Sequence, residues 1–557
     1  MSSRTAAEYG PLLYGTTAVT SPDRLWSLAN FGELITAPVT PLCWSVWHQG
    51  LESGSRAAYA DFGVLSPAEV EPPTDPNGLL GACFAGRIAL NIDFTRALMA
   101  AIPGASGDGF ERDIVGKVRP GLPPDRTDPR RLPALLTKAP LLFVRAARTT
   151  TSGAQEMAEW WRDEVLDARP AADLAAATTR FDSALARVRR AARCQAGSRF
   201  VVMAVQAQLV ALCERAGVPE LSNRIMAGLG DLPEARLADD LWLAGRGERT
   251  ADDLLRSYGY YGVHIGNMTG RSWRQDPSLL AARIKAATSD TAARRPRDRQ
   301  SEAQAARAAA IERLLATVPR LKRPLASKLA RSSAVQFRAL ENGKAAVMMA
   351  VDGCRAAAGE AGAALAAVGM LERPGDVVFL RHDELASAGR EDPRARIEER
   401  RAVWETFADV SIPTHFVGEP RVTARSRPGG AGSVTGPTPG PTTGSTTGAV
   451  PGTIAGAAGS PGVAEGFVRL VADASGDLEP GEILVCPFTD PSWTPLMAAA
   501  AAMVVDVGGP ASHGAVVARE LGLPCVIGTE TAMTGLRDGD RVRVDGTRGT
   551  VEVLARG

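Results

Sequence analysis

An uncharged run rich in glycine and proline divides this chain of 557 residues into two unequal parts. Residues 428–452 contain eight glycines, five prolines and no charged residue. Such a composition buries too little apolar surface to fold, so we predict a flexible linker there. A flexible segment of this length spans on average about 25 to 30 Å, which suits a domain that moves relative to its neighbour. The same composition also suits a plain spacer between two static domains.

The longer part, residues 1–427, has the pattern of a mainly α-helical domain. Two stretches, residues 152–217 and 301–365, are rich in Ala, Arg and Leu, with apolar residues three and four positions apart. Short strand-like runs occur at residues 87–92 and 376–380. The chain is long enough for two to four domains, because single cores seldom exceed roughly 250 to 300 residues.

The shorter part, residues 453–557, is predicted to be a small α/β domain. Residues 482–488 and 541–554 form apolar, strand-like runs, and the second contains an Asp-Gly turn. The fold class is therefore multidomain, with a large helical domain followed by a small domain that combines sheet and helix.

The charge and cysteine content indicate a cytoplasmic protein that acts on small molecules or proteins. The chain has 63 basic and 62 acidic residues, so its net charge of +1 predicts neither nucleic acid nor a membrane as partner. Its seven cysteines are scattered without a CxxC pair, as expected of reduced core residues. We find no signal-peptide pattern at the N-terminus and no 18-residue apolar segment.

The segment Val507–Gly528, VGGPASHGAVVARELGLPCVIG, predicts a strand, a tight turn and a short helix. Gly508 and Gly509 follow an apolar run and permit the turn. Ser512 is a suitable N-cap for a helix from His513 to Leu521, which Gly522 and Pro524 then terminate. His513 is thus predicted to lie in the first turn of this helix.

His513 is the main candidate catalytic residue. Free backbone N–H groups and the helix dipole favour an anion at a helix start, so a phosphoryl group on the imidazole would be stabilised there. Histidine can also act as a covalent nucleophile. The alternative is a structural histidine that caps the helix or forms a hydrogen bond in a loop.

This segment resembles the mobile phosphohistidine domain of the phosphoenolpyruvate-utilising enzymes, which include phosphoenolpyruvate synthase, pyruvate phosphate dikinase and rifampin phosphotransferase. The matching residues are Gly508, Gly509, Ser512, His513, Ala515, Val516, Val517, Ala518 and Arg519. The resemblance implies a swivelling domain that carries a phosphoryl group on His513. It assigns Gly509, Ser512, Arg519 and Glu520 to the same catalytic segment.

The helical part resembles the acceptor-binding domain of rifampin phosphotransferase. The matches occur in sequence order at residues 30–33, 38–42, 86–91, 102–105, 272–277 and 376–385, and at Glu341 with Lys344. One departure is Gly262–Asn267, GVHIGN, which stands where we expect a Gly-His-Arg-Gly-like run after the paired tyrosines. A changed acceptor or a lost contact would each explain it.

The same resemblance predicts that the chain depends on a partner. Rifampin phosphotransferase and the synthases carry an ATP-grasp domain that phosphorylates the histidine, and no segment of this sequence matches it or a GxxxxGK[ST] phosphate loop. We therefore expect a separate ATP-grasp subunit, with Mg²⁺ and ATP as its cofactors. No cofactor is expected to bind this chain tightly.

Glu520 and Arg519 follow His513 by seven and six residues. On an α-helix Glu520 lies about 20° from His513, so we expect it to orient the imidazole. Arg519 lies off that face and is expected to dock the mobile domain.

The acceptor pocket is predicted between Tyr258 and Asp276. Aromatic walls with a few convergent polar groups are typical of ligand sites. His264 is a candidate general base, and the other candidate binding residues are Asn267, Arg271, Trp273 and Arg274. A structural histidine and surface ion pairs of the arginines are the alternatives. Trp44 and Trp47 are pocket walls or core, and no role is assigned to His48, His382 or His415.

Together these features predict a phosphotransferase component that passes a phosphoryl group from His513 to a hydroxyl of a small organic acceptor. A first alternative is a dehydratase in which the phosphate then leaves as a leaving group. A second is a relative without catalysis that binds or sequesters a ligand.

Overall fold

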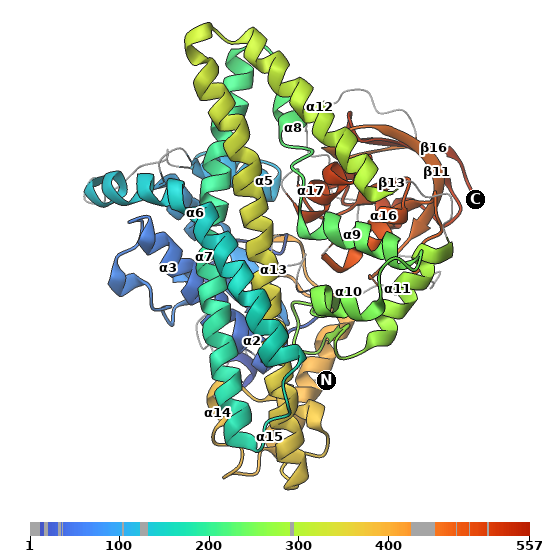
Figure 1. Cartoon of the computed structure of the whole chain (residues 1–557). Helices are drawn as coiled ribbons and strands as arrows, with labels where there is room; N and C mark the ends of the chain where they lie inside the picture. The colour runs from blue at the N-terminus through green and yellow to red at the C-terminus, as the bar shows by residue number, and fades with distance from the viewer. Residues whose placement is uncertain are drawn as a thin grey trace.

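The computed structural model describes residues 10, 12–15, 20–29, 31, 35, 37–102, 105–122, 132–289, 295–424, 452–474, 476–489, 491–509 and 512–557. It has a large helical region followed by a C-terminal domain with a mixed sheet (Figure 1). The predicted linker lies outside the described residues except for Gly452, as do most of residues 30–33.

Three long helices form the core of the helical region (Figure 1). They are α6 (Leu132–Trp161), α7 (Leu174–Arg215) and α13 (Arg323–Ala367). Small residues let them approach closely, because a Cβ on Gly353 of α13 would lie 2.4 Å from the Trp160 ring of α6. By length and composition α7 could cross a membrane, but 56% of that apolar stretch is buried inside the protein.

The remaining helices surround this core. Those before α13 are α2 (Pro41–Val46), the π-helix η1 (Trp47–Glu52), α3 (Ser53–Asp61), α4 (Ile92–Ala100), α5 (Gly107–Val115), α8 (Leu221–Ile225), α9 (Pro233–Ala244), α10 (Ala251–Tyr258), α11 (Pro277–Ser289) and α12 (Pro296–Thr317). Those after it are α14 (His382–Leu385) and α15 (Arg394–Thr406). The helical stretches predicted at residues 152–217 and 301–365 are confirmed, each with a short break.

Short strands join the two ends of the helical region. An antiparallel sheet has the order β2-β3-β1-β7, from β1 (Leu25–Ser27), β2 (Gly81–Phe84), β3 (Arg87–Asn91) and β7 (His415–Val417). Two smaller pairs are β4 (Gly262–Val263) with β5 (Arg271–Ser272), and β6 (Val410–Ser411) with β8 (Thr423–Ala424). The strand predicted at residues 87–92 is confirmed. The one at 376–380 is wrong, because Pro374 starts a 3₁₀ helix, η7 (Pro374–Phe379), that packs on Gly362 of α13.

The C-terminal domain contains an eight-stranded sheet of order β10-β14-β13-β12-β11-β15-β16-β9. Its parallel centre, β12 (Ile483–Cys486), β13 (Ala502–Val505) and β14 (Cys525–Ile527), is continuously apolar because it is covered on both faces. The other strands are β9 (Thr453–Ala455), β10 (Ala457–Ser460), β11 (Val463–Leu470), β15 (Arg541–Asp545) and β16 (Thr550–Ala555). The helices are α16 (Thr494–Ala499), α17 (His513–Glu520) and α18 (Ala532–Gly535).

The C-terminal domain docks on the helical region through α17. The Glu520 carboxylate accepts the backbone N–H groups of Leu229, at 2.7 Å, and Gly230, at 3.0 Å. Gly228 and Gly230 have φ of 61° and 69°, and a Cβ on Gly228 would lie 2.3 Å from a carbonyl oxygen of α12. Glycine therefore shapes the loop that binds Glu520.

Further contacts cross this boundary, and Ala238 of α9 packs against the apolar core of the C-terminal domain. The guanidinium of Arg299 donates to the Ala498 carbonyl at 3.0 Å, and that of Arg283 donates to the Ala474 and Gly476 carbonyls. Val516 of α17 adds an apolar contact with residues of α7, α9 and α13. The interface thus combines a few specific hydrogen bonds with a small apolar patch, as suits a reversible contact.

We predict that Glu520→Ala weakens docking. The variant removes two charge-assisted hydrogen bonds, each worth about 1.5 to 3 kcal/mol, and leaves two buried amides without an acceptor. Small-angle X-ray scattering should report a larger radius of gyration. Glu552→Ala, an exposed change in the same domain, is the control. Identical scattering from the Glu520 variant and the parent would contradict the docking role.

Candidate functional site

The loop before α17 is held by hydrogen bonds within the C-terminal domain. Asp506, at the end of β13, accepts the Thr529 hydroxyl and the Ala532 N–H, both at 2.6 Å, and the Met533 N–H at 3.1 Å. Gly508 has φ of 137°, where a side chain is strained and a Cβ would approach Ile527. Ser512 caps α17 by accepting the Ala515 N–H at 3.5 Å. The predicted strand, turn and capped helix are confirmed.

His513 lies at the start of α17 and faces the helical region. Its side chain is only 4% exposed, and its Nε2 is 3.7 Å from Oε1 of Glu234, in the first turn of α9. Burial raises the pKa of Glu234, but the neighbouring imidazole lowers it more, with help from Lys344, so the net pKa is below the usual value. The Glu234 carboxylate is therefore positioned to orient the His513 ring.

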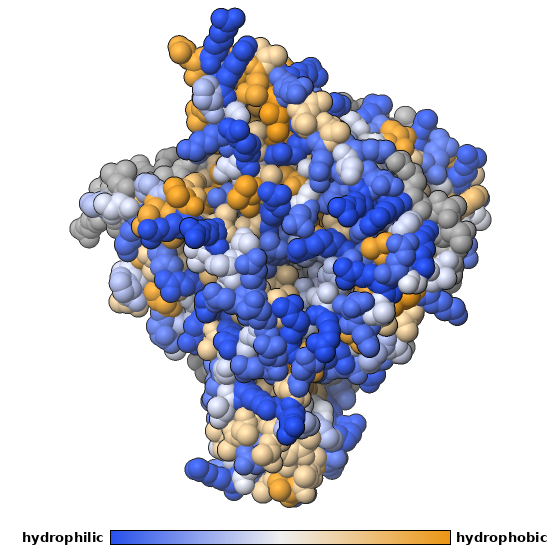
Figure 2. Space-filling view, in the orientation of Figure 1, coloured by the Kyte–Doolittle hydropathy of each residue, from blue (hydrophilic) through white to orange (hydrophobic). Residues whose placement is uncertain are grey.

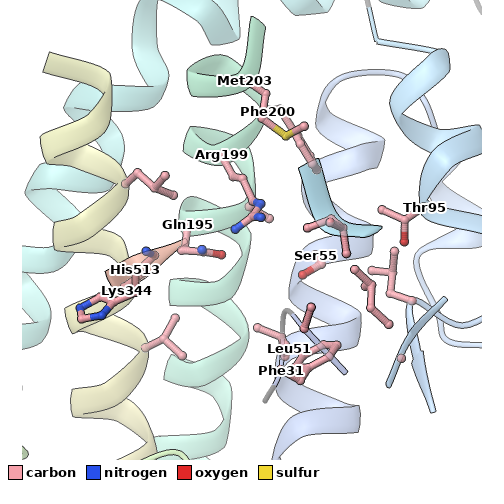
Figure 3. Close-up of a pocket in the computed structure, with 18 of the residues that line it drawn as sticks. Phe31, Leu51, Ser55, Thr95, Gln195, Arg199, Phe200, Met203, Lys344 and His513 are labelled. Atoms are coloured by element: carbon pink, nitrogen blue, oxygen red, sulfur yellow. The ribbon is translucent and has the colours of Figure 1, made fainter. Parts of the chain in front are cut away.

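A cavity of about 230 Å³ opens beside His513. His513 lies at one end of it with Lys344, and Thr95 lies at the other (Figure 3). Its walls come from α7, α13, η1, α3 and the small N-terminal sheet, and Gly508, Gly509 and Ser512 complete it. The C-terminal domain therefore contributes part of the cavity wall, including the candidate nucleophile.

Polar groups line this cavity on several elements. Those on α7 and α13 are Gln195, Arg199, Gln206, Glu341 and Lys344, and Glu52 of η1, Ser55 of α3 and Thr95 of α4 also line it. The Glu341 side chain is 1% exposed and forms an ion pair of 2.9 Å with Lys344. Oε2 of Glu341 and Oε2 of Glu234 accept no hydrogen bond from the described residues. Of these two carboxylates only Glu341 lines the cavity, so its Oε2 is able to receive a proton from a ligand.

The rest of the cavity is aromatic and aliphatic. Aromatic walls include Phe31, Trp44, Trp47, Tyr59, Phe110 and Phe200. His48 also lines the cavity, and its ring stacks on Trp44 with centroids 5.2 Å apart. Its Nδ1 has no hydrogen-bond partner among the described residues, and burial lowers its pKa. Such a surface suits a large, mainly apolar ligand with a few polar groups.

The predicted acceptor residues do not line this cavity. Asn267 is fully buried and donates to the backbone carbonyls of Ala37 and Pro38. Trp273 stacks on Tyr261, and Arg271 is an exposed residue 3.6 Å from Asp276. Asn267 and Trp273 pack in the interior of the region around the loop between β4 and β5, and Arg271 lies on its surface. None of the three lines a pocket of the kind predicted.

His264 and Arg274 are also placed outside the cavity. His264 has φ of 54° in the same loop, and burial lowers its pKa although Asp473 of the C-terminal domain raises it. Arg274 donates to the buried Asp352 carboxylate at 2.9 Å, which also accepts Arg355 and Trp161. Arg274 therefore belongs to a buried charge network that fixes the loop.

The two residues at the end of α17 are placed differently from their predicted roles. Glu520 binds backbone amides of the helical region and not the imidazole. Arg519 is buried beside Cys525, and burial lowers its pKa to about 10. The docking expected of Arg519 is thus provided by Glu520, because the carboxylate and not the guanidinium faces the Leu229–Gly230 amides.

Sequence reasoning missed Glu234, Gln195, Arg199 and His48. Glu234 and His513 are far apart in the chain and come together only when the domains dock. No local pattern marks Glu234 beyond its place after Pro233 at a helix start. Glu341 and Lys344 were noted through the resemblance, and their three-residue spacing does place them on one face of α13. Within the described ranges, no group of three or more His, Cys, Asp or Glu residues is arranged to hold a metal ion.

Comparison with known protein families supports both parts of this arrangement. Residues 478–549 match the family described as PEP-utilising enzyme, mobile domain. Residues 177–340, which include Glu234, match the family described as Rifampicin phosphotransferase fourth domain. The resemblance stated from the sequence is confirmed for these two segments.

Curated relatives are similar over the C-terminal domain. The rifampicin phosphotransferases of Streptomyces sviceus and Bacillus subtilis are 55% and 51% identical over 97 and 96 residues, which is 17% of this chain and 11% of each relative. The phosphoenolpyruvate synthase of Aeropyrum pernix is 50% identical over 95 residues, 16% of this chain and 12% of that protein. The chain therefore spans only about a ninth of the length of these relatives.

We predict that Asp352→Ala destabilises the fold by about 3 to 5 kcal/mol, because it leaves the buried charge of Arg355 without its partner. Burial raises the pKa of Asp352, but Arg274 and Arg355 lower it below the usual value. Its stabilisation is therefore present above a pH of about 4 and is lost as the pH falls. Urea unfolding at several pH values tests this. Asp167→Ala, which removes an exposed ion pair with Arg256, is the control. Equal losses in the two variants would contradict the prediction.

Proposed function

We propose that this protein is a phosphotransferase that carries a phosphoryl group on His513 and transfers it to a hydroxyl of a large, mainly apolar acceptor. The observation that carries the proposal is the position of His513. It starts a helix in a segment that matches the PEP-utilising mobile domain, and it opens into an aromatic cavity of the helical region. Donor and acceptor sites of a group transfer are thus adjacent.

The proposed transfer step gives roles to three polar residues of the cavity, Glu341, Lys344 and Arg199. The acceptor oxygen forms a bond to phosphorus while the N–P bond breaks, and the bonding electron pair returns to the imidazole nitrogen. The hydroxyl proton passes to the free Oε2 of Glu341, which acts as general base. Lys344 and Arg199 line the same cavity and balance the negative charge of the phosphoryl oxygens.

Glu234 is a positioning residue in this mechanism. Its carboxylate faces Nε2 of the ring at 3.7 Å and is positioned to hold the orientation of the imidazole during transfer. Because the ring is 4% exposed when docked, water is largely excluded from the phosphoryl group.

Loading of His513 requires another arrangement of the domains. A phosphoryl donor cannot reach a ring that is buried against α9, so the C-terminal domain must undock first. The small interface and the predicted linker support such a movement. We propose that a separate ATP-grasp subunit, with Mg²⁺ and ATP, loads His513. All seven cysteines are free, which suits a cytoplasmic enzyme.

The cavity favours a large acceptor over a small acid such as pyruvate. Its aromatic walls would remain in contact with water around a small anion, whereas a polycyclic compound would cover them. Two relatives are named rifampicin phosphotransferase, so rifampicin is the first acceptor to test. Release of inorganic phosphate together with a dehydrated product would indicate the dehydratase alternative instead.

The test of the carrier role is direct labelling of the full chain. Incubation with phosphoramidate, a small-molecule phosphoryl donor, should give one acid-labile phosphoryl adduct on the peptide that contains His513. His513→Ala should abolish it. His382→Ala should not, because His382 is held by Gln49 and Asp182 and does not line the cavity. Intact mass before and after acid treatment is the measurement. An adduct that persists in His513→Ala would overturn the assignment.

Glu341→Gln should slow phosphoryl transfer from preloaded His513 to rifampicin by about 10² to 10⁴, the usual contribution of a general base. Loading should be unchanged, because it occurs while His513 is away from Glu341. Single-turnover transfer and loading rates are measured separately. Glu312→Gln, an exposed change on α12, is the control. Parental transfer by the Glu341 variant would exclude this residue as the base.

A further inference from the structure

The helical region extends into an arm that projects beyond the rest of the molecule (Figure 1). The arm consists of the ends of α7, α8, α12 and α13. It has its own small core, with buried Leu212, Leu221, Leu314 and Ala326. This small core therefore stabilises the turn between α12 and α13 at the tip of the arm.

The tip of the arm combines basic side chains with exposed apolar ones. Residues 320–331, RLKRPLASKLAR, contain five basic residues and no acidic one. Leu321 is 97% exposed and Leu325 is 56% exposed. Figure 2 shows apolar and hydrophilic surface side by side at this end of the molecule.

The leucines of the tip lie at the end of the turn and in the first two turns of α13. Leu321, Leu325 and Leu329 are four residues apart, and Leu329 packs against the core while the first two extend past it. In the part of the chain that the structure describes, the side chains of five tip cations form neither an ion pair nor a hydrogen bond: Arg320, Lys322, Arg323, Lys328 and Arg331. The nearby Arg313, by contrast, pairs with Glu220 at 3.1 Å.

We propose that this tip binds an anionic lipid surface. Leucine side chains that face water are stabilised when they enter the boundary between headgroups and acyl chains, and adjacent cations are attracted to anionic headgroups. The combination of two exposed leucines with five unpaired cations provides both contributions in twelve residues. The net charge of +1 for the whole chain conceals this cluster, because acidic residues elsewhere balance it.

The shape of the tip favours a lipid surface over an acidic protein. A stable protein interface needs roughly 800 Å² on each partner, with shape complementarity. The tip is a narrow turn between two helices and offers two exposed leucines (Figure 1). A fluid bilayer needs no complementary shape and accepts a small inserted apolar surface. The inference is independent of the phosphotransferase proposal.

Vesicle sedimentation of the full chain tests this proposal. We expect binding to phosphatidylcholine vesicles that contain about one third phosphatidylglycerol, but not to pure phosphatidylcholine. Binding should weaken as salt rises above about 0.1 M. The double variant Leu321→Ser, Leu325→Ser should bind about 10- to 100-fold more weakly. Lys322→Glu with Arg323→Glu should abolish binding.

Val368→Ser is the matched control, because Val368 is 69% exposed just beyond the opposite end of the same helix. Circular dichroism should show all variants folded, since the changed side chains are exposed. Absence of binding to the anionic vesicles would overturn the proposal. Equal binding by the tip variants, the control and the parent would also overturn it. Loss of His513 loading by a partner subunit in the tip variants, without vesicle binding by the parent, would identify the tip as a protein docking site instead.

Discussion

The contact between α17 and the loop before α9 is the constraint on which the proposed chemistry depends. The same histidine must be buried when it delivers a phosphoryl group and accessible when it receives one. A large apolar interface would hold the domain permanently, and a purely exposed contact would not exclude water. The structure instead combines hydrogen bonds between side chains and backbone groups, made by Glu520, Arg283 and Arg299, with apolar contacts at Val516 and Ala238. Hydrogen bonds of this kind fix orientation, while the small apolar area keeps the contact reversible.

Docking also completes the cavity. Without Gly508, Gly509 and His513 the helical region would present an open aromatic cleft to water. When the C-terminal domain closes it, the charged groups near His513 are in a less polar environment, where their interactions with a phosphoryl group are stronger. The proposed functional unit is therefore the docked pair of domains, and neither domain alone contains both the candidate nucleophile and the proposed general base.

The features that could be predicted from the sequence are local ones. Ser512, Gly508 and Gly522 define the ends of α17 through caps and backbone conformation, and apolar runs define β12 to β14. Glu234 could not be predicted, because its contact with His513 depends on how two domains dock. The same limit explains Glu520 and Arg519, since a helical projection gives relative angles but not the surface that each face meets. Residues 376–380 were mistaken for a strand because apolar content alone does not separate a strand from a short helix that starts at a proline.

The loop between β4 and β5 and the tyrosines before it influence Glu234 without lining the cavity beside His513. Tyr260 and Tyr261, which directly precede β4, are buried near Glu234, whose charge raises the pKa of Tyr260 in addition to the larger effect of burial. The same loop is fixed by the Asp352 network, through Arg355 donating to the carbonyls of Ile265 and Asn267. A carboxylate surrounded by buried aromatic rings has few alternative partners, so it depends on the imidazole for stabilisation. Substitutions in this loop, where the sequence departs from the expected pattern, would therefore alter the hold of Glu234 on His513 without contacting the acceptor.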